Sequence, residues 1–170
     1  MHLIHRGIVN KNYKENLLNS FKISFKKTNR VYINKDELYI LKNIKLNSSL
    51  NKVRDVFLFA CYTGLSYIDL YNLNIKNIQK GNDGLQWIYI KRHKTDIPSN
   101  VPILPYALYI LDIYKKHKNT NRIFPMISNQ KTNKALKEIA RLCSFNKKIT
   151  FHSARHTFAT TITLTNGVPI

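Results

Sequence analysis

Three basic side chains towards the end of the sequence could do chemistry together: His152, Arg155 and His156. On a helix, His152 and Arg155 stand three residues apart and share a face, so an imidazole and a guanidinium project to one place. A guanidinium can donate two hydrogen bonds to the oxygens of a phosphate, and an imidazole can handle a proton near neutral pH. The pattern favours a site that binds a phosphate group.

Two other interpretations of this segment stay open. His152 and His156 have the i, i+4 spacing of a helical zinc pair, but Ser153 stands where metalloproteases carry their glutamate. No nearby carboxylate or thiolate completes a ligand set, so we expect no metal. The segment can also be a solvated basic helix face with no ligand.

Two further segments carry polar residues in a pattern that suggests a role. Lys94 lies in the polar turn Lys91–Asp96, and a lysine at a turn can protrude into a groove or give a proton to a leaving oxygen. Alone this signal is weak, because exposed lysines usually serve only solubility. Upstream, Gly64 interrupts a helical pattern, and Ser66 with Asp69 three residues later forms a capping box that starts a new helix.

The charge of the chain indicates a polyanionic partner. The 170 residues include 28 Lys and Arg against 9 Asp and Glu, a net charge of +19. Residues 1–54 carry 12 basic and 3 acidic side chains and residues 111–170 carry 11 and 2, so each flank has a net charge of +9. Because the basic residues alternate with apolar ones at structural spacing, they suit a folded surface along a phosphate backbone. A merely solubilising basic surface is the alternative.

Periodicity predicts an α+β fold that is mainly α, with a small three-stranded antiparallel sheet inserted after the third helix. Asn34 and Glu37 form a capping box for the first helix, and Gly64 is placed to end the second. The turn 81–84 predicts a hairpin between 75–80 and 85–91. The expected third strand is 101–104, and the expected helices span about 33–44, 50–62, 66–72, 105–117, 130–143 and 151–167.

Other classes of protein are disfavoured by what the sequence contains. No apolar run approaches the ~18 residues that cross a membrane, and the first residues lack the apolar core of a secretion signal. The two cysteines, Cys61 and Cys143, fall in apolar helical patterns and predict buried thiols in a reducing compartment, not a disulfide framework. We therefore expect a soluble intracellular protein.

In series, these motifs resemble the catalytic domain of the tyrosine recombinases of the phage-integrase type. The resemblance comprises Thr63-Gly64-Leu65 with Asp69-Leu70, then Lys94-Thr95, then His152-x-x-Arg155-His156-Thr157-Phe158-Ala159. It implies that Arg155 clamps the scissile phosphate, that His152 manages its protons and that Lys94 is the general acid for the 5′-oxygen. Asp69 would be a structural support. The family implies no metal or cofactor.

Two departures from the family pattern affect the expected site. The first catalytic arginine of the family would fall at Ser66, a variant similar to integrases of mobile elements in Bacteroides-type bacteria. The nucleophilic tyrosine would follow Arg155 by some tens of residues, and we expect none of the tyrosines of this chain to serve. Arg54, on the preceding helix, is a candidate replacement for the missing arginine, although it can instead pair with Asp55 or Asp36 on the surface. If Arg54 does not serve, the second cation is Arg92, Arg141 or a lysine, or there is none.

By resemblance, residues 1–30 are the tail of a core-binding domain with a basic linker, and 31–170 are a catalytic domain without its C-terminal part. The implied function is site-specific cutting and rejoining of DNA through a phosphotyrosine, with double-stranded DNA and other recombinase protomers as partners. The implied location is the bacterial cytoplasm, at the nucleoid. The alternatives are a non-catalytic DNA-binding or regulatory domain derived from a decayed integrase, and a helix-turn-helix regulator, which the inserted sheet disfavours.

Overall fold

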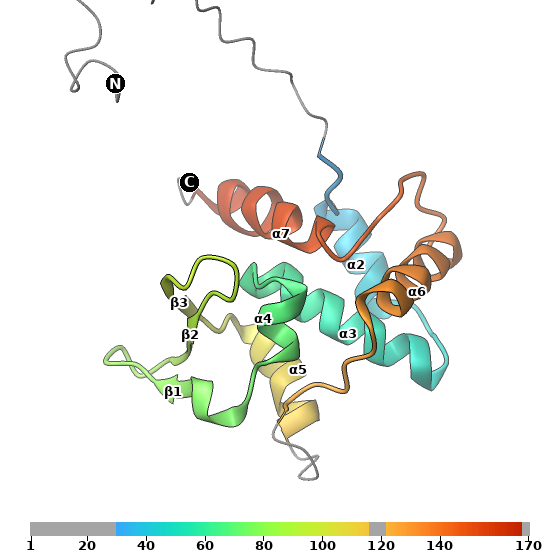
Figure 1. Ribbon diagram of the computed structural model, residues 1–170. Helices are drawn as coiled ribbons and strands as arrows, with labels where there is room; N and C mark the ends of the chain where they lie inside the picture. Colours follow the sequence, from blue (N-terminus) through green and yellow to red (C-terminus); the bar gives the residue numbers. More distant parts are fainter. Residues whose placement is uncertain (1–29, 116–121, 168–170) are drawn as a thin grey trace, which may run out of the picture.

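The computed structural model describes residues 30–115 and 122–167, and it confirms a mainly helical α+β fold with one small sheet (Figure 1). Of the expected core-binding tail and linker at 1–30, all but residue 30 lies outside the described residues. In chain order the elements are α2 (Lys35–Asn43), α3 (Ser48–Thr63), α4 (Tyr67–Tyr71), the 3-10 turn η2 (Ile75–Asn77), β1 (Ile78–Lys80), β2 (Gln86–Lys91), β3 (Pro98–Pro102), α5 (Pro105–Lys115), α6 (Asn129–Leu142), α7 (Ser153–Thr157), the π-helical η3 (Phe158–Thr163) and the 3-10 turn η4 (Leu164–Asn166).

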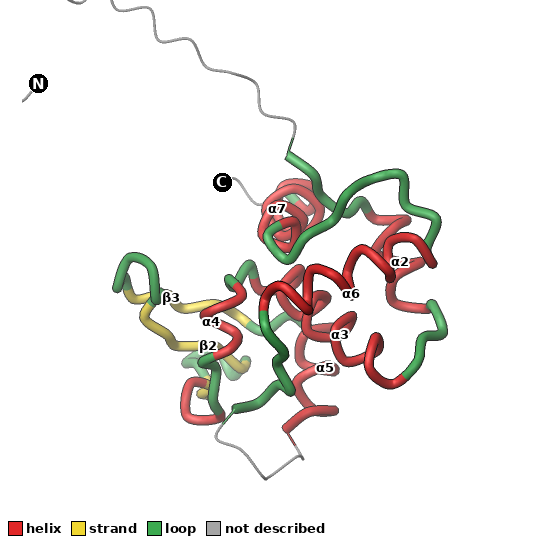
Figure 2. The backbone as a smooth tube through the Cα atoms, turned by 45° about the vertical axis from the view of Figure 1, so that its right-hand side comes forward, coloured by secondary structure: helices red, strands yellow, loops and turns green. Residues whose placement is uncertain are grey.

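Helix α3 lies at the centre of the fold and packs against α5, α6 and α7 (Figure 2). Its inward positions Val53, Phe57, Ala60 and Cys61 are all buried, as the apolar spacing predicts. The helix ends at Gly64, whose φ of +66° is the left-handed conformation that favours glycine. Because α3 contacts most of the other helices, the chain that leaves its C-terminal end has a fixed direction.

Two short-range capping motifs fix the starts of α2 and α4. The Asn34 side chain accepts a hydrogen bond from the Glu37 N–H at 2.9 Å, and the Glu37 carboxylate accepts one from the Asn34 N–H at 2.8 Å. Ser66 and Asp69 make the same reciprocal arrangement at α4. Both predicted capping boxes are confirmed.

The sheet has the order β1-β2-β3 and is antiparallel throughout, but two of its boundaries differ from the prediction. Residues 75–77 form η2 instead of a strand, because the Asn74 side chain accepts from the Lys76 N–H and offers the backbone a local alternative. Strand β3 begins at Pro98, where a polar turn was expected, and pairs with β2 from Lys91 to Trp87. An edge strand tolerates the prolines at both of its ends.

The last helical segment is less regular than the single helix expected over 151–167. It begins as α7, widens into the π-helical η3 and closes with η4 before Gly167. Thr157 and Thr161 bind this segment to Ile33, the residue that precedes the cap of α2. The Ile33 N–H donates to the Thr157 hydroxyl at 2.9 Å, and the Thr161 hydroxyl donates to the Ile33 carbonyl at 2.6 Å.

No helix within residues 30–115 and 122–167 is long and apolar enough to cross a membrane.

Candidate functional site

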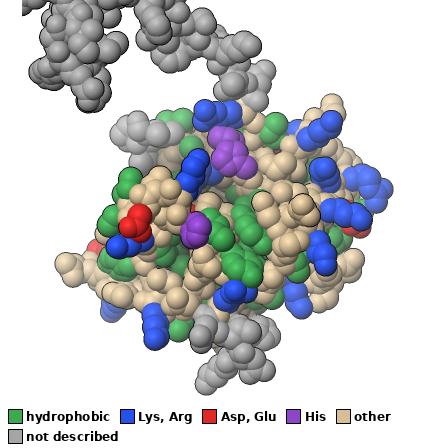
Figure 3. Space-filling view, in the orientation of Figure 1, with side chains coloured by type: hydrophobic (Ala, Val, Ile, Leu, Met, Phe, Trp, Pro, Cys, Tyr) green, Lys and Arg blue, Asp and Glu red, His purple; other side chains and the backbone are tan. Residues whose placement is uncertain are grey.

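A cavity of about 420 Å³ lies between α4, the β2–β3 turn, the start of α6 and the start of α7. The polar side chains in its lining come from segments far apart in the sequence: Ser66, Asp69, Arg92, Lys94, Thr95, Asn129, Asn133, Thr150, His152 and Arg155. Lys and Arg side chains are spread over the face shown in Figure 3, and Asp and Glu are few there. The fold thus brings together in one cavity three residues that the sequence analysis assigned to one site: Arg155, His152 and Lys94.

Arg155 is held from one side and open on the other. Its Nε donates a hydrogen bond to the Gly64 carbonyl at 3.1 Å, which fixes the plane of the guanidinium. Among the residues that the structure describes, none bonds to its two terminal nitrogens. The pKa of Arg155 is lowered, mainly by burial and then by the positive charge of Arg92, while Asp69 opposes the shift. Arg92 and Arg155 line the same cavity, so an anion bound in that cavity would be attracted by both positive charges.

The β2–β3 turn carries Arg92 and Lys94, and Asp69 ties it to α4. The Asp69 carboxylate accepts from the His93 N–H at 3.1 Å through one oxygen and from the Ser66 hydroxyl at 2.6 Å through the other. The turn is closed by the bond from the Asp96 N–H to the Arg92 carbonyl at 2.8 Å. Asp69 is buried, whereas Lys94 is exposed at the cavity. The carboxylate thus places the turn, and the lysine on it stays free to move towards a ligand.

His152 lies at the start of α7 with its side chain exposed and lining the cavity. Its ring is 4.8 Å from that of His156, in an edge-to-face arrangement. His156 does not line the cavity. Within the described part of the chain no group of three His, Cys, Asp or Glu could hold a metal ion, so the zinc interpretation of the pair finds no third ligand there.

Arg54 does not reach the cavity. Its Nε and one terminal nitrogen donate to the Asp55 carboxylate at 3.0 and 2.9 Å, and the other terminal nitrogen donates to the Ile44 carbonyl at 3.0 Å. The side chain is 16% exposed. In the structure Arg54 does not extend over α3 to the position of Ser66, because its donors bind the neighbouring Asp55 and the Ile44 carbonyl before the start of that helix. The alternative interpretation, pairing with Asp55, is what the structure has.

Arg92 lines the cavity, although the sequence analysis ranked it behind Arg54 as the replacement for the missing arginine. The sequence feature that indicates Arg92 is its position two residues before Lys94 in the polar turn. Ser66 itself lines the cavity, but its hydroxyl is used in the cap of α4. Arg92 thus supplies a second guanidinium in the same cavity as the serine.

Comparison with known proteins places this fold and cavity in a family. The sequence profile described as "Phage integrase family" matches residues 32–170. The chain belongs to the phage integrase family. Nearly all of the described residues of this integrase-family chain, including every residue that lines the cavity, lie in the matched range. No individual curated protein matches the sequence significantly.

Solved structures with this integrase fold include three informative examples. The XerH site-specific recombinase bound to difH substrate aligns with a TM-score of 0.61 and 18% identity, over 93% of this chain and 56% of that one. The lambda integrase catalytic core aligns at 0.61 and 19%, over 76% and 85%. The Tn1549 transposon integrase in complex with circular intermediate DNA aligns at 0.62 and 15%, over 96% and 66%. At these identities the likeness establishes the fold, and the chain spans 56% of the XerH chain in that complex.

Proposed function

We propose that residues 31–170 form the catalytic domain of a site-specific DNA recombinase of the integrase type, which cuts and rejoins double-stranded DNA. The observation that carries this proposal is the cavity in which Arg92 and Lys94 of the β2–β3 turn meet His152 and Arg155 of the α7 segment. Family membership gives the reaction class, and the cavity supplies the cationic groups that such a reaction requires.

The reaction we propose is an attack on a DNA phosphodiester by a tyrosine hydroxyl. The tyrosine oxygen forms a bond to phosphorus, the bond to the 5′-oxygen breaks, and negative charge grows on the two non-bridging oxygens. Arg155 and Arg92 stabilise that charge as preorganised donors. His152 accepts the proton that the attacking hydroxyl releases, and Lys94 gives a proton to the leaving 5′-oxygen. The reverse steps rejoin the strand, because the phosphotyrosine link retains the energy of the broken ester.

The attacking tyrosine does not come from the cavity lining. Tyr67 is the tyrosine in that lining, and its hydroxyl donates to the Ile127 carbonyl. Burial and then Tyr71 raise the pKa of Tyr67 while Arg122 opposes the shift, and a raised pKa disfavours the phenolate form that a nucleophile needs. We propose that a segment outside the described residues brings the nucleophile to the cavity.

The partners that we propose are duplex DNA and further protomers of the same recombinase. The charge of +19 supports the first. Among proteins of this fold, lambda integrase is described as a tetramer bound to a Holliday junction, which supports the second. We further propose that residues 1–30 are the end of a core-binding domain and a basic linker, and that the protein acts at the nucleoid of a bacterial cytoplasm.

Vanadate provides a direct test on this chain, because it mimics a phosphoryl group in its trigonal bipyramidal state. We expect the chain to bind vanadate and a duplex oligonucleotide to displace it. Arg155→Ala and Arg92→Ala should each weaken vanadate binding about tenfold or more, as loss of a charge-assisted donor pair implies. Arg141→Ala, an exposed arginine on α6, is the matched control. Vanadate binding that survives both cavity substitutions would contradict the proposed site.

A second measurement separates a recombinase domain from a DNA-binding domain without chemistry. In a protein that also carries the nucleophilic tyrosine, Lys94→Ala should slow strand cleavage much more than it weakens DNA binding, because the lysine acts on the leaving oxygen. A cleavage rate equal to that of the unaltered protein would remove Lys94 from the mechanism.

A further inference from the structure

Two asparagines of α6, Asn129 and Asn133, line the same cavity as Arg155 and Arg92. They stand four residues apart and therefore share a face of the helix. Their side chains are joined, since the Asn133 Nδ2 donates to the Asn129 Oδ1 at 3.1 Å. Such a pair commonly stabilises the surface of a helix. The direction in which the two amides point indicates a further role.

The backbone fixes the orientation of the Asn133 amide. The Phe151 N–H donates to the Asn133 Oδ1 at 2.8 Å. A backbone N–H can only donate, so the oxygen of Asn133 faces Phe151 and its Nδ2 faces away. Phe151 is itself held in place, because its buried ring makes edge contacts with the rings of Phe57 and Tyr67. Asn133 therefore presents a donor, and not an acceptor, to Asn129.

These two bonds make Asn129 a donor at the cavity. Its Oδ1 accepts from Asn133, which leaves its Nδ2 at the end of the series. Within residues 30–115 and 122–167 no group accepts a hydrogen bond from this Nδ2, and the side chain is exposed where it lines the cavity. Successive hydrogen bonds polarise one another, which strengthens the last donor.

The chemistry of this donor indicates its ligand. An asparagine that reads adenine uses its oxygen and its nitrogen together, but the oxygen of Asn129 is turned towards Asn133. A phosphate oxygen only accepts, so it fits a single N–H donor. The guanidinium groups of Arg155 and Arg92 line the same cavity. A neutral amide adds a hydrogen bond there without adding a third positive charge beside the two arginines.

We propose that Asn129 is a further substrate-binding residue of this cavity, whose Nδ2 donates to a non-bridging oxygen of the phosphate that Arg155 and Arg92 hold. Asn133 is its positioning residue. The inference rests on the proposed function and adds a neutral donor to the same site. The phosphate is then held from a third segment, α6, besides the β2–β3 turn and α7.

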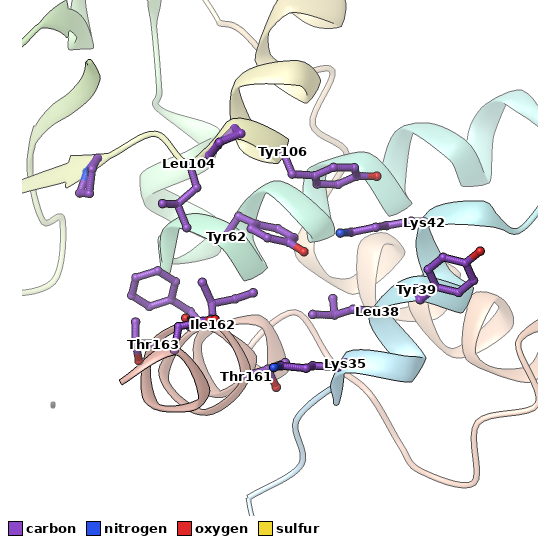
Figure 4. A pocket seen from close by; sticks show the side chains of 14 residues that line it. Lys35, Leu38, Tyr39, Lys42, Tyr62, Leu104, Tyr106, Thr161, Ile162 and Thr163 are labelled. Carbon is purple, nitrogen blue, oxygen red and sulfur yellow. Dashed lines mark hydrogen bonds between the residues drawn. The ribbon is translucent and has the colours of Figure 1, made fainter. Parts of the chain in front are cut away.

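The larger cavity of the fold offers an anion a different environment. It has a volume of about 770 Å³ and lies between α2 and η3, closed by the end of α3 and the start of α5 (Figure 4). It shares no lining residue with the first cavity, and its cations are Lys35 and Lys42, without an arginine. Because two lysines can also attract an anion, the test has to distinguish the two cavities.

The test measures the vanadate affinity of the whole chain at physiological ionic strength. Asn129→Asp keeps an acceptor for Asn133 and the shape of the side chain, but it replaces the N–H donor with a negative charge. Vanadate affinity should fall about tenfold or more, because a donor is lost and the carboxylate repels the anion. Asn129→Ala, which removes only the neutral donor, should lower the affinity about threefold to tenfold.

Gln130→Glu is the matched control, because it makes the same amide-to-carboxylate change one residue along, at an exposed position outside the cavity. It should change vanadate affinity by less than about twofold, since salt screens a charge on the exposed face. Urea denaturation should give Asn129→Asp the same unfolding free energy as the unaltered chain, which shows that the variant is folded.

Three results would overturn the inference. If the asparagines only stabilise α6, Asn129→Asp keeps the acceptor and should bind vanadate as Gln130→Glu does; with Arg155→Ala still defective, the proposed function would stand without Asn129. Vanadate binding that K35A/K42A removes and Asn129→Asp does not would place the anion in the larger cavity. A chain that binds no vanadate, or binds it equally after Arg155→Ala and Asn129→Asp, would contradict the proposed function together with the inference.

Discussion

The guanidinium of Arg155 and the carbonyl oxygen of Gly64 are joined by a 3.1 Å hydrogen bond across 91 positions of sequence. The same glycine ends α3 and lies against the ring of Phe158, three residues beyond Arg155. The position of the arginine in the cavity therefore depends on the backbone geometry at the end of the central helix.

Gly64→Ala should destabilise the fold and loosen Arg155. The residue has a φ of +66°, and an added Cβ would come within 2.7 Å of the Phe158 ring. The left-handed conformation and the displaced ring together should cost about 1–3 kcal/mol of unfolding free energy, measured by urea denaturation. Vanadate affinity should fall with it, because the carbonyl that orients Arg155 moves.

Gly167→Ala is the control for that substitution. Gly167 has a similar φ of +76°, but an added Cβ would meet no atom within 4 Å. Gly167→Ala should lower the unfolding free energy because alanine disfavours the left-handed conformation, but it should leave vanadate affinity unchanged. Equal effects at the two glycines would mean that the contact with Phe158 does not position Arg155.

Asp69→Ala should release the β2–β3 turn from α4. The substitution removes the acceptor of the His93 N–H and half of the capping box with Ser66. Loss of a cap costs about 1 kcal/mol, and the unanchored turn should exchange its amide hydrogens faster around His93. Hydrogen-exchange mass spectrometry measures the effect, with the exposed Asp112→Ala on α5 as control. If exchange in the turn is unchanged while α4 is destabilised, Asp69 serves the helix and not the turn.

His156 should make the fold less stable in mild acid. Its pKa is lowered from the ordinary 6.5, first by burial and then by the charges of His152, Arg30 and Arg155. Because the unfolded chain binds this proton more readily than the folded one, the contribution of His156 is complete above about pH 6.5 and declines as the pH falls through that value towards the lowered pKa. His156→Gln should therefore flatten the dependence of unfolding free energy on pH in this window. His93→Gln, on the exposed turn, is the control, and an equal flattening there would refute the assignment.

The features predicted correctly from the sequence are those that depend on near neighbours. The two capping boxes and the glycine end of α3 each rest on residues within four positions, so side-chain type and spacing determine them. The predicted start of strand β3 is three residues too late. Its pairing with β2 is not local, and a proline such as Pro98 is typical of a turn. The sequence alone does not predict whether Arg54 or Arg92 lies beside Ser66, for the same reason. The answer depends on which face of α3 carries Arg54 and on where the β2–β3 turn, 26 residues after Ser66, is anchored.

The contrast between these two arginines gives the last prediction. Arg54 holds Asp55 and the Ile44 carbonyl, and Asp55 also accepts from the Tyr114 hydroxyl at 2.9 Å. Arg54→Ala leaves a half-buried carboxylate without its cation, so we expect a loss of about 1–3 kcal/mol in unfolding free energy. The vanadate affinity of the Arg54→Ala chain, measured well below the unfolding temperature, should equal that of the unaltered chain.

Arg92→Ala should have the opposite pattern, with vanadate affinity reduced and unfolding free energy maintained. It removes an arginine whose charge repels Arg155, so stability should be unchanged or slightly higher while vanadate affinity falls about tenfold. An Arg54→Ala chain that is fully stable but does not bind vanadate would return the role of second cation to Arg54.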